Sequence, residues 1–250
     1  MIIDIHTHCN IGSPFDCPES NEHKRNLPFM LNDYDNCGIT AGGFSPYSSV
    51  LSGGESGIFS DNEYFYNFSK NNERVYQWVV LDPRQDNLFE QIRKLIKGDK
   101  VLGIKIHSAY HKYDILEYGD KIFSFANELG CFVQMHPDKV IDMVPFADKY
   151  PNMKLIISHL TSKHPIIDAI KQAKHGNIYT DTSSSGSTFN NIIEYAVETV
   201  GSEKIFFGTD TYACGYEIGR INYARINQED KENIFYKNAK KQFERQFKNL

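Results

Sequence analysis

Two histidines one residue apart close the apolar run near the start of the chain, IIDIHTHC. A β-strand points successive side chains to opposite faces, so His6 and His8 would leave such a strand on the same side. Each neutral imidazole offers a nitrogen that can bind a divalent cation. The pair is equally compatible with ordinary hydrogen-bonded histidines, so the metal interpretation depends on what other strands bring to the same place.

Four later runs are also apolar until they end in a polar residue. GIKIH carries Lys105 and His107 on one face. VQMH ends at His136, IISH at His159 and FFGTD at Asp210. An unpaired ionisable group in a core costs several kcal/mol, so packing alone does not explain the same pattern on four strands. The convergence of these ends predicts a metal centre.

The predicted centre has four protein ligands, His6, His8, His136 and Asp210. Nitrogen donors with one carboxylate suit zinc, with manganese, iron or cobalt as alternatives. The ion would activate a water, and Asp210 would accept a proton from it. His159 is predicted as a catalytic residue outside the ligand set that orients the water or polarises a substrate carbonyl.

Two further strand-end residues allow several roles. Lys105 could be carboxylated and bridge a second metal, neutralise Asp210, or bind an anionic substrate. His107, one step nearer the mouth of the predicted pocket, could contact the substrate or a second metal. The remaining histidines are expected in surface loops or helices: His23, His111, His164 and His175.

Short β-rich runs alternate with helical patterns along the whole chain. Strands that are apolar at nearly every residue are typical of a parallel sheet covered by helices. About eight such units predict an α/β fold, a (β/α)8 TIM barrel that forms a single domain over residues 1–250. A doubly wound sheet is disfavoured because HTHCNIGSPF has no GxGxxG turn. The predicted strands are 1–6, 40–45, 75–82, 101–107, 131–136, 155–160, 177–183 and 204–210, and predicted helices include 86–98, 118–130 and 164–176, the last two ending on Gly130 and Gly176.

Composition and charge exclude several classes of partner. The chain has 250 residues, with 32 acidic and 27 basic side chains and a net charge of -5. This balance argues against a nucleic-acid or anionic-membrane partner and leaves a small-molecule substrate, with a homo-oligomer as an open alternative. The 5 cysteines are odd in number and form no CxxC pair, which is typical of a reducing compartment. Without a signal peptide or an apolar span, the chain is predicted to be cytoplasmic.

Two long connections follow the first two predicted strands, at 9–29 and 46–60. Connections of this length in a compact domain are usually lids or binding loops. In a barrel both would lie at the carboxyl ends of the strands, where such enzymes keep their active sites. Phe15, Tyr47 and Tyr110 are predicted to line that mouth.

Taken together, these motifs resemble the amidohydrolase superfamily, and most closely its amidohydrolase-related branch, which includes aminocarboxymuconate-semialdehyde decarboxylase. The residues that carry the resemblance are IDIHTH, GIKIH, His136, His159 and FFGTD, in the family's order, and the tail KENIFYKNAKKQF resembles that branch's closing helix. The resemblance implies a TIM barrel with an extra C-terminal helix and a mononuclear or binuclear metal centre. It also implies His6, His8, His136 and Asp210 as ligands and His159 as the catalytic acid/base.

The leading functional hypothesis is a metal-dependent hydrolase that uses a metal-activated water on an amide, ester or lactone carbonyl. The alternative is a nonoxidative decarboxylase of the same family, which needs basic groups to bind a carboxylate; Lys24, Arg25, Arg84 and Lys112 are the candidates. A phosphoesterase is less favoured because GTDTY lacks the second Asp-x-His motif of such enzymes. A binding protein that has lost turnover is disfavoured by the intact set of ligands and acid/base.

Overall fold

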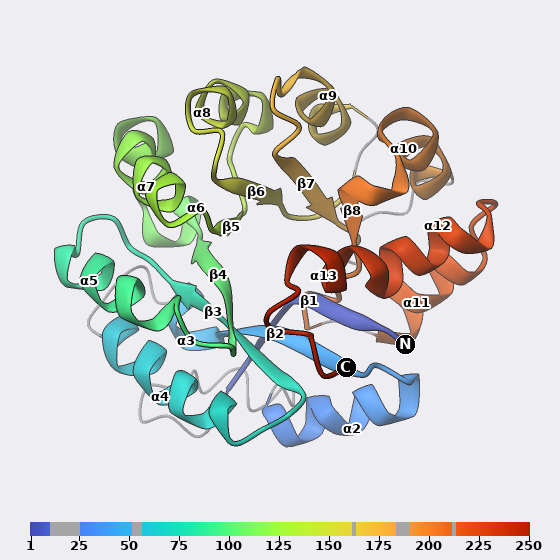
Figure 1. Ribbon diagram of the computed structural model, residues 1–250, viewed down its shortest axis with the longest axis horizontal. Helices are drawn as coiled ribbons and strands as arrows, with labels where there is room; N and C mark the ends of the chain where they lie inside the picture. Colours follow the sequence, from blue (N-terminus) through green and yellow to red (C-terminus); the bar gives the residue numbers. More distant parts are fainter. Residues whose placement is uncertain (11–25, 52–56, 162–163, 184–190, 212–213) are drawn as a thin grey trace.

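The computed structural model is a barrel of eight parallel strands that follow one another in chain order (Figure 1). It describes residues 1–10, 26–51, 57–161, 164–183, 191–211 and 214–250. Strand β8 is short, and the ring is closed onto β1 by the Ile5 amide, which donates to the Phe207 carbonyl at 2.9 Å. The strands are β1 Ile3–Cys9, β2 Ala41–Pro46, β3 Val75–Val80, β4 Val101–Ile106, β5 Phe132–Met135, β6 Lys154–Ile157, β7 Ile178–Asp181 and β8 Ile205–Phe206.

Helices surround the strands, as Figure 1 shows. Each of the eight predicted runs contains a strand, although β8 is much shorter than its predicted run and β1 extends beyond its own, and the (β/α)8 fold class is confirmed. The consecutive strand order rules out the doubly wound alternative, in which the order reverses. The α-helices are α2 Leu27–Cys37, α3 Tyr47–Leu51, α4 Ile58–Lys70, α5 Asp86–Leu95, α6 Ser108–His111, α7 Ile115–Leu129, α8 Val144–Lys149, α9 Pro165–Gln172, α10 Ile192–Val200, α11 Cys214–Asn222, α12 Gln228–Glu232 and α13 Asn238–Gln242.

The two predicted helix ends at glycine have different outcomes. Gly130 follows α7 with φ 60°, and its amide donates to carbonyls of the last turn, so this prediction is confirmed. Gly176 also has a positive φ of 61°, but α9 already ends at Gln172, and the prediction that the helix reaches Gly176 is wrong. Ala173 is extended, with ψ 113°, and this conformation ends the helix early.

The extra C-terminal helix is present and closes the floor of the barrel. It runs through α12, a π-helical turn at Asn233–Lys237, and α13. Phe243, directly after α13, packs its ring 4.6 Å from Phe132 and 5.9 Å from Trp78. The Trp78 indole is buried and donates to the Ile5 carbonyl at 2.6 Å. The amino-terminal end of the barrel is therefore filled by aromatic packing.

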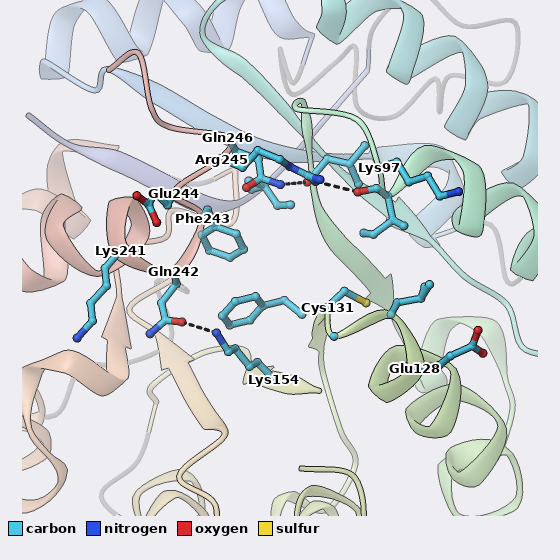
Figure 2. Close-up of a pocket in the computed structure, with 16 residues that line it drawn as sticks. Lys97, Glu128, Cys131, Lys154, Lys241, Gln242, Phe243, Glu244, Arg245 and Gln246 are labelled. Atoms are coloured by element: carbon cyan, nitrogen blue, oxygen red, sulfur yellow. Dashed lines mark hydrogen bonds between the residues drawn. The ribbon is translucent and has the colours of Figure 1, made fainter. Parts of the chain in front are cut away.

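A cavity of about 630 Å³ lies beside this floor, between the C-terminal segment and the first residues of β4, β5 and β6 (Figure 2). Some of its polar side chains bind one another or the backbone. Lys154 Nζ donates to Gln242 Oε1 at 2.8 Å, and Gln246 Nε2 donates to the Val101 carbonyl at 2.7 Å. Since Val101 and Lys154 begin their strands, the cavity lies at the end of the barrel opposite the strand-end histidines.

The two long connections after β1 and β2 are only partly loops. Residues 11–25, and with them Phe15, His23, Lys24 and Arg25, lie outside the described part of the chain. The second connection is helical at both ends, because it contains α3 and the start of α4, so the prediction of a continuous loop there is wrong. Among the described residues, none of the helices combines the length and hydropathy that crossing a membrane requires.

Phe243→Ala should lower the free energy of unfolding by about 3 kcal/mol, because it leaves a cavity beneath the Trp78 and Phe132 rings. Chemical denaturation followed by Trp78 fluorescence measures this. Tyr223→Ala is the control, since Tyr223 is 90% exposed and its loss should change stability by no more than about 0.5 kcal/mol. Equal effects of the two substitutions would contradict the role of Phe243.

Candidate metal centre

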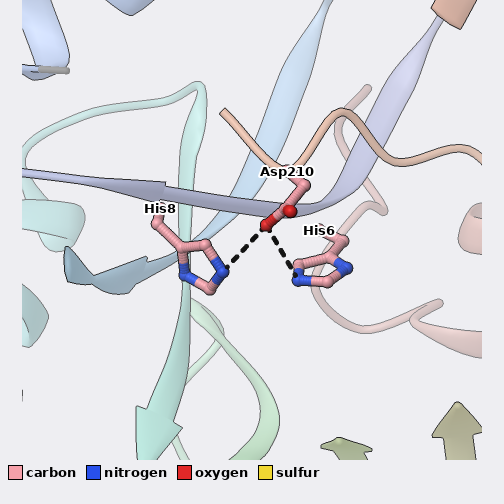
Figure 3. A group of neighbouring side chains, drawn as sticks. All are labelled: His6, His8 and Asp210. Carbon is pink, nitrogen blue, oxygen red and sulfur yellow. Dashed lines mark ion pairs between the residues drawn. The ribbon is translucent and has the colours of Figure 1, made fainter. Parts of the chain in front are cut away.

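His6, His8 and Asp210 meet where β1 and β8 end (Figure 3). His8 Nε2 lies 3.2 Å from Asp210 Oδ1, and His6 Nε2 lies 3.6 Å from the same oxygen. One ligand atom from each of the three falls within 4.8 Å of the others, a spacing that a single ion can bridge. The first strand and the segment after the last strand thus bring together three of the four predicted ligands.

The Nδ1 atoms of His6 and His8 contact side chains outside the group of His6, His8 and Asp210. His6 Nδ1 lies 2.9 Å from Asp181 Oδ2, and His8 Nδ1 lies 2.5 Å from Ser45 Oγ. Partners of this kind fix the tautomer and the ring orientation of metal-binding histidines. With both Nδ1 atoms engaged, both Nε2 atoms face Asp210, so the donor set fits a divalent ion.

Asp210 sits in a tight turn that is bound to β1. Its φ is 52° and that of Thr211 is 69°, a region that residues other than glycine rarely adopt. The amide of Asp210 donates to the His6 carbonyl at 2.8 Å, and Thr211 Oγ1 donates to the His8 carbonyl at 2.8 Å. These contacts hold the strained turn and aim the carboxylate at the two histidines.

Asp4 joins β1 to the segment that follows β8. Its buried carboxylate accepts hydrogen bonds from Thr209 Oγ1 at 2.6 Å and from Tyr34 Oη at 2.7 Å. Burial raises the pKa of Asp4 to about 7, although these hydrogen bonds act in the opposite direction. Asp4 therefore links β1, α2 and the end of β8, and it belongs to neither three-residue group that could hold an ion.

His159, after β6, lies beside the same carboxylate. Its Nε2 is 3.8 Å from Asp210 Oδ2, and its ring stacks on His6 at 5.1 Å. Its backbone has a φ of 71°, a further strained position at the site. Its Nδ1 lies 2.9 Å from Ser183 Oγ. The structure thus places His159 next to the group of His6, His8 and Asp210, and its role as acid/base stays a prediction.

Asp181 is a buried carboxylate that the strand-end analysis missed. It is the last residue of β7, and with His6 and His159 it forms a second group whose ligand atoms lie within 4.8 Å of one another. The run NIYTDTS carries an acid two residues before its end, and this is the signal that could have placed Asp181 among the converging residues. Ser183, two residues on, gave no signal, because serine is common in any loop.

Lys105 is a buried residue of β4, and its side chain reaches the His6 imidazole. Its Nζ lies 2.9 Å from His6 Nε2 and 3.3 Å from Gln134 Oε1. Burial lowers the pKa of Lys105 to about 8, while the Asp210 and Asp181 carboxylates favour its charged form. Its predicted roles in bridging a second metal, neutralising Asp210 or binding an anionic substrate stay predictions.

His136, after β5, lies beside His159, and His107, after β4, lies beside His136. The His136 ring lies 4.8 Å from that of His159 and stacks parallel to His107 at 5.1 Å. His136 is in neither group whose ligand atoms lie within 4.8 Å of one another, so its role as fourth ligand stays a prediction. The His107 ring lies 4.2 Å from that of Tyr110. The predicted contact of His107 with a substrate or a second metal stays a prediction.

The charges at the site favour a cation. Burial, together with the charge of Lys105, lowers the pKa of His6 to about 3, and burial also lowers that of His136 to about 4. Both imidazoles are therefore neutral near pH 7, the form that binds metals. Burial opposes ionisation of Asp210, but the hydrogen bond from His8 and the neighbouring imidazoles hold its pKa well below the ordinary value. The group thus combines neutral nitrogen donors with an ionised carboxylate.

Some of the remaining predicted residues are buried or lie close to the site, and others are exposed. The expectation that His111 lies on the surface is wrong: it is fully buried, and its Nε2 donates to the Ser49 carbonyl at 2.9 Å. His164 and His175 are exposed, as expected. Tyr47 does reach the site, with its ring 6.3 Å from that of His8. Arg84 binds Asp82, with Nη2 at 2.7 Å from Oδ2.

A sequence profile described as amidohydrolase matches residues 3–245, nearly the whole chain. The chain belongs to the amidohydrolase family. The family predicted from the strand-end residues is thereby confirmed, and this amidohydrolase is an enzyme. No curated protein sequence matches it significantly.

Solved structures share the fold of this amidohydrolase over nearly its full length at low identity. 5-Carboxyvanillate decarboxylase from Sphingomonas paucimobilis has a TM-score of 0.79 at 12% identity, covering 97% of this chain and 98% of that one. The enzyme of that name from Novosphingobium aromaticivorans, solved with manganese, has a TM-score of 0.75 at 13% identity over 98% and 96%. 4-Oxalomesaconate hydratase from Rhodopseudomonas palustris has a TM-score of 0.68 at 14% identity over 98% and 96%.

Asp181→Asn should weaken divalent-metal affinity roughly 10- to 100-fold, because an amide supports the His6 imidazole less well than a carboxylate. Competition with a chromophoric chelator measures the affinity for zinc and for manganese. Asp168→Asn is the matched control, since that carboxylate lies on α9, is partly exposed and belongs to neither group that could hold an ion. Unchanged affinity in Asp181→Asn would show that His6 does not depend on Asp181 for metal binding.

Proposed function

We propose that this amidohydrolase is a metal-dependent hydrolase that acts on an amide, ester or lactone of a small molecule. The observation that carries the proposal is the convergence of His6 Nε2, His8 Nε2 and the Asp210 carboxylate, with both Nδ1 atoms engaged from outside. His136 is proposed as the fourth ligand, because its ring lies next to that of His159 on the same wall.

Each group in this arrangement has a chemical task. A bound divalent ion would lower the pKa of a water and polarise the carbonyl that the water attacks. Asp210 accepts a proton from that water, since its carboxylate is held in the ionised form. His159, 3.8 Å from Asp210, passes a proton between the water and the leaving group.

We propose zinc as the ion, with manganese as the first alternative. Three imidazoles and one carboxylate suit zinc, and a structural neighbour was solved with manganese. We further propose one ion rather than two. Unmodified Lys105 already contacts His6 and Gln134, and its positive charge offsets the carboxylates. A second ion would require carboxylation of Lys105.

Nonoxidative decarboxylation is the second candidate, and the decarboxylases among the structural neighbours favour it. Such a reaction needs a cation that binds the substrate carboxylate. Arg84 does not offer a free one, since it donates to both oxygens of Asp82. Lys112 is exposed, while Lys24 and Arg25 lie outside the described residues. Lys105, the buried cation of the site, contacts His6 and Gln134. We therefore keep hydrolysis, performed in the cytoplasm on a small molecule, as the first proposal.

Chelation should abolish activity, and zinc or manganese should restore it. His8→Asn and Asp210→Asn should each weaken metal affinity by at least about 100-fold, and His136→Asn by about 10-fold or more. Elemental analysis and chelator competition measure these changes. His164→Asn is the control, because His164 is exposed and distant from the ligands. Unchanged affinity in His136→Asn would exclude His136 as a ligand.

The metal-loaded enzyme should hydrolyse members of a panel of esters, lactones and amides and release no CO₂ from aromatic or unsaturated acids. Asp210→Asn should lower kcat on any substrate found by roughly 10²- to 10⁴-fold. Coupled CO₂ detection and pH-indicator assays distinguish the two reactions. Release of CO₂ without hydrolysis of any panel member would replace the hydrolase proposal with the decarboxylase.

A further inference from the structure

Ser183 contacts three members of the site through one oxygen. Its Oγ makes a short hydrogen bond to Asp181 Oδ1 and lies 3.0 Å from His6 Nδ1 and 2.9 Å from His159 Nδ1. The hydroxyl is fully buried, so these contacts are its environment. It is the only group in the described part of the chain that contacts both the ligand histidine and the acid/base histidine through their Nδ1 atoms.

The hydrogen-bonding capacity of a hydroxyl decides the direction of these bonds. A serine has one proton to donate and two lone pairs that accept. An ionised carboxylate only accepts, so the Ser183 proton must point to Asp181. Both lone pairs of Oγ then face imidazole Nδ1 atoms, and each of those nitrogens must carry a proton.

Asp181 has the contacts of an ionised acceptor. Besides the Ser183 hydroxyl it faces His6 Nδ1 at 2.9 Å, the Ser183 amide at 3.0 Å and the His159 amide at 3.3 Å. A proton on Asp181 Oδ1 would lie against the two backbone N–H groups that donate to that oxygen.

We infer that Ser183 and Asp181 fix His159 as the Nδ1–H tautomer, so that its Nε2 lone pair faces the Asp210 side of the site and accepts the proton that Asp210 takes from the water. The inference rests on the proposed function for what that proton is, but the tautomer itself depends only on the protein. Ser183 and Asp181 are positioning residues, since they act through His159.

The proton balance follows from this tautomer. As water attacks the substrate carbonyl, Asp210 takes its proton and passes it to His159 Nε2, and the imidazolium keeps its Nδ1–H on Ser183. Asp210 Oδ2, 3.8 Å from Nε2, stabilises that charge. The same proton then leaves Nε2 for the departing amine or alcohol, which restores the neutral imidazole. Protonation of a substrate carbon, as in decarboxylation, would need another donor, since this tautomer of His159 has no proton to give at Nε2.

The tautomer can be read directly from nitrogen chemical shifts. The full-length protein, labelled with ¹⁵N-histidine, contains 9 histidines, and His159→Gln identifies the signals of His159. Long-range ¹H–¹⁵N spectra at about pH 8.5, above the ordinary imidazole pKa, are recorded for the metal-free and zinc-loaded forms. The expected result in both forms is a protonated Nδ1 and an unprotonated Nε2 in His159.

Ser183→Ala should shift His159 toward the Nε2–H tautomer and lower kcat roughly 10- to 100-fold, with KM and zinc stoichiometry unchanged. Ser183→Thr keeps a hydroxyl and should restore both the tautomer and kcat. Ser158→Ala is the matched control. Ser158 is a buried serine next to His159, and its Oγ makes no hydrogen bond to any residue that the structure describes. This substitution should leave the tautomer unchanged.

An Nε2–H tautomer in the wild-type protein would overturn the inference, and so would a His159 spectrum that Ser183→Ala leaves unchanged. A changed tautomer with unchanged kcat would overturn its catalytic part. Failure of the proposed function has a different signature: no zinc bound and no substrate turned over. In that case the metal-free spectrum still decides the tautomer.

Discussion

The seam between β1 and the end of β8 is the constraint on which the site depends. Strand β8 has two residues, too few to pair fully with its neighbour, so side chains and the turn that follows complete the closure. Asp4 binds Thr209, and the amide of Asp210 donates to the His6 carbonyl. These bonds close the barrel and also set the distance between the carboxylate and the two histidines. Fold and site therefore share one set of interactions.

The two ends of the barrel have different roles: one contributes to stability, and the other carries the ionisable groups of the site. At one end the helix of α12 and α13 covers Trp78, Phe132 and Phe243, which pack as an apolar floor. At the other end the strands finish in buried ionisable groups, which would be costly if they were not partnered. Each partner there has a second effect: it fixes which nitrogen of an imidazole is free. The cost of burying polar groups is thus offset by contacts that also prepare the site for an ion.

Similarity at 12–14% identity extends over nearly the whole of several decarboxylases and a hydratase, and at that level it describes the scaffold. A barrel of this kind supports different reactions because the groups at the strand ends, not the strands, determine the chemistry. In this amidohydrolase the described cations near the site are already paired or exposed, whereas the proton-accepting groups are buried and aligned. The proposed hydrolysis follows from that balance of groups rather than from the scaffold.

The sequence by itself determined the alternation of strands and helices, the closing helix, and the strand ends that carry His6, His8, His159 and Asp210, because periodicity and burial act locally along the chain. It did not reveal Asp181 and Ser183 as partners of His6, or that His111 is buried against Ser49. Those contacts join residues 62 to 177 positions apart. Which nitrogen of a ring is engaged depends on such distant neighbours, and only the closed barrel brings them together.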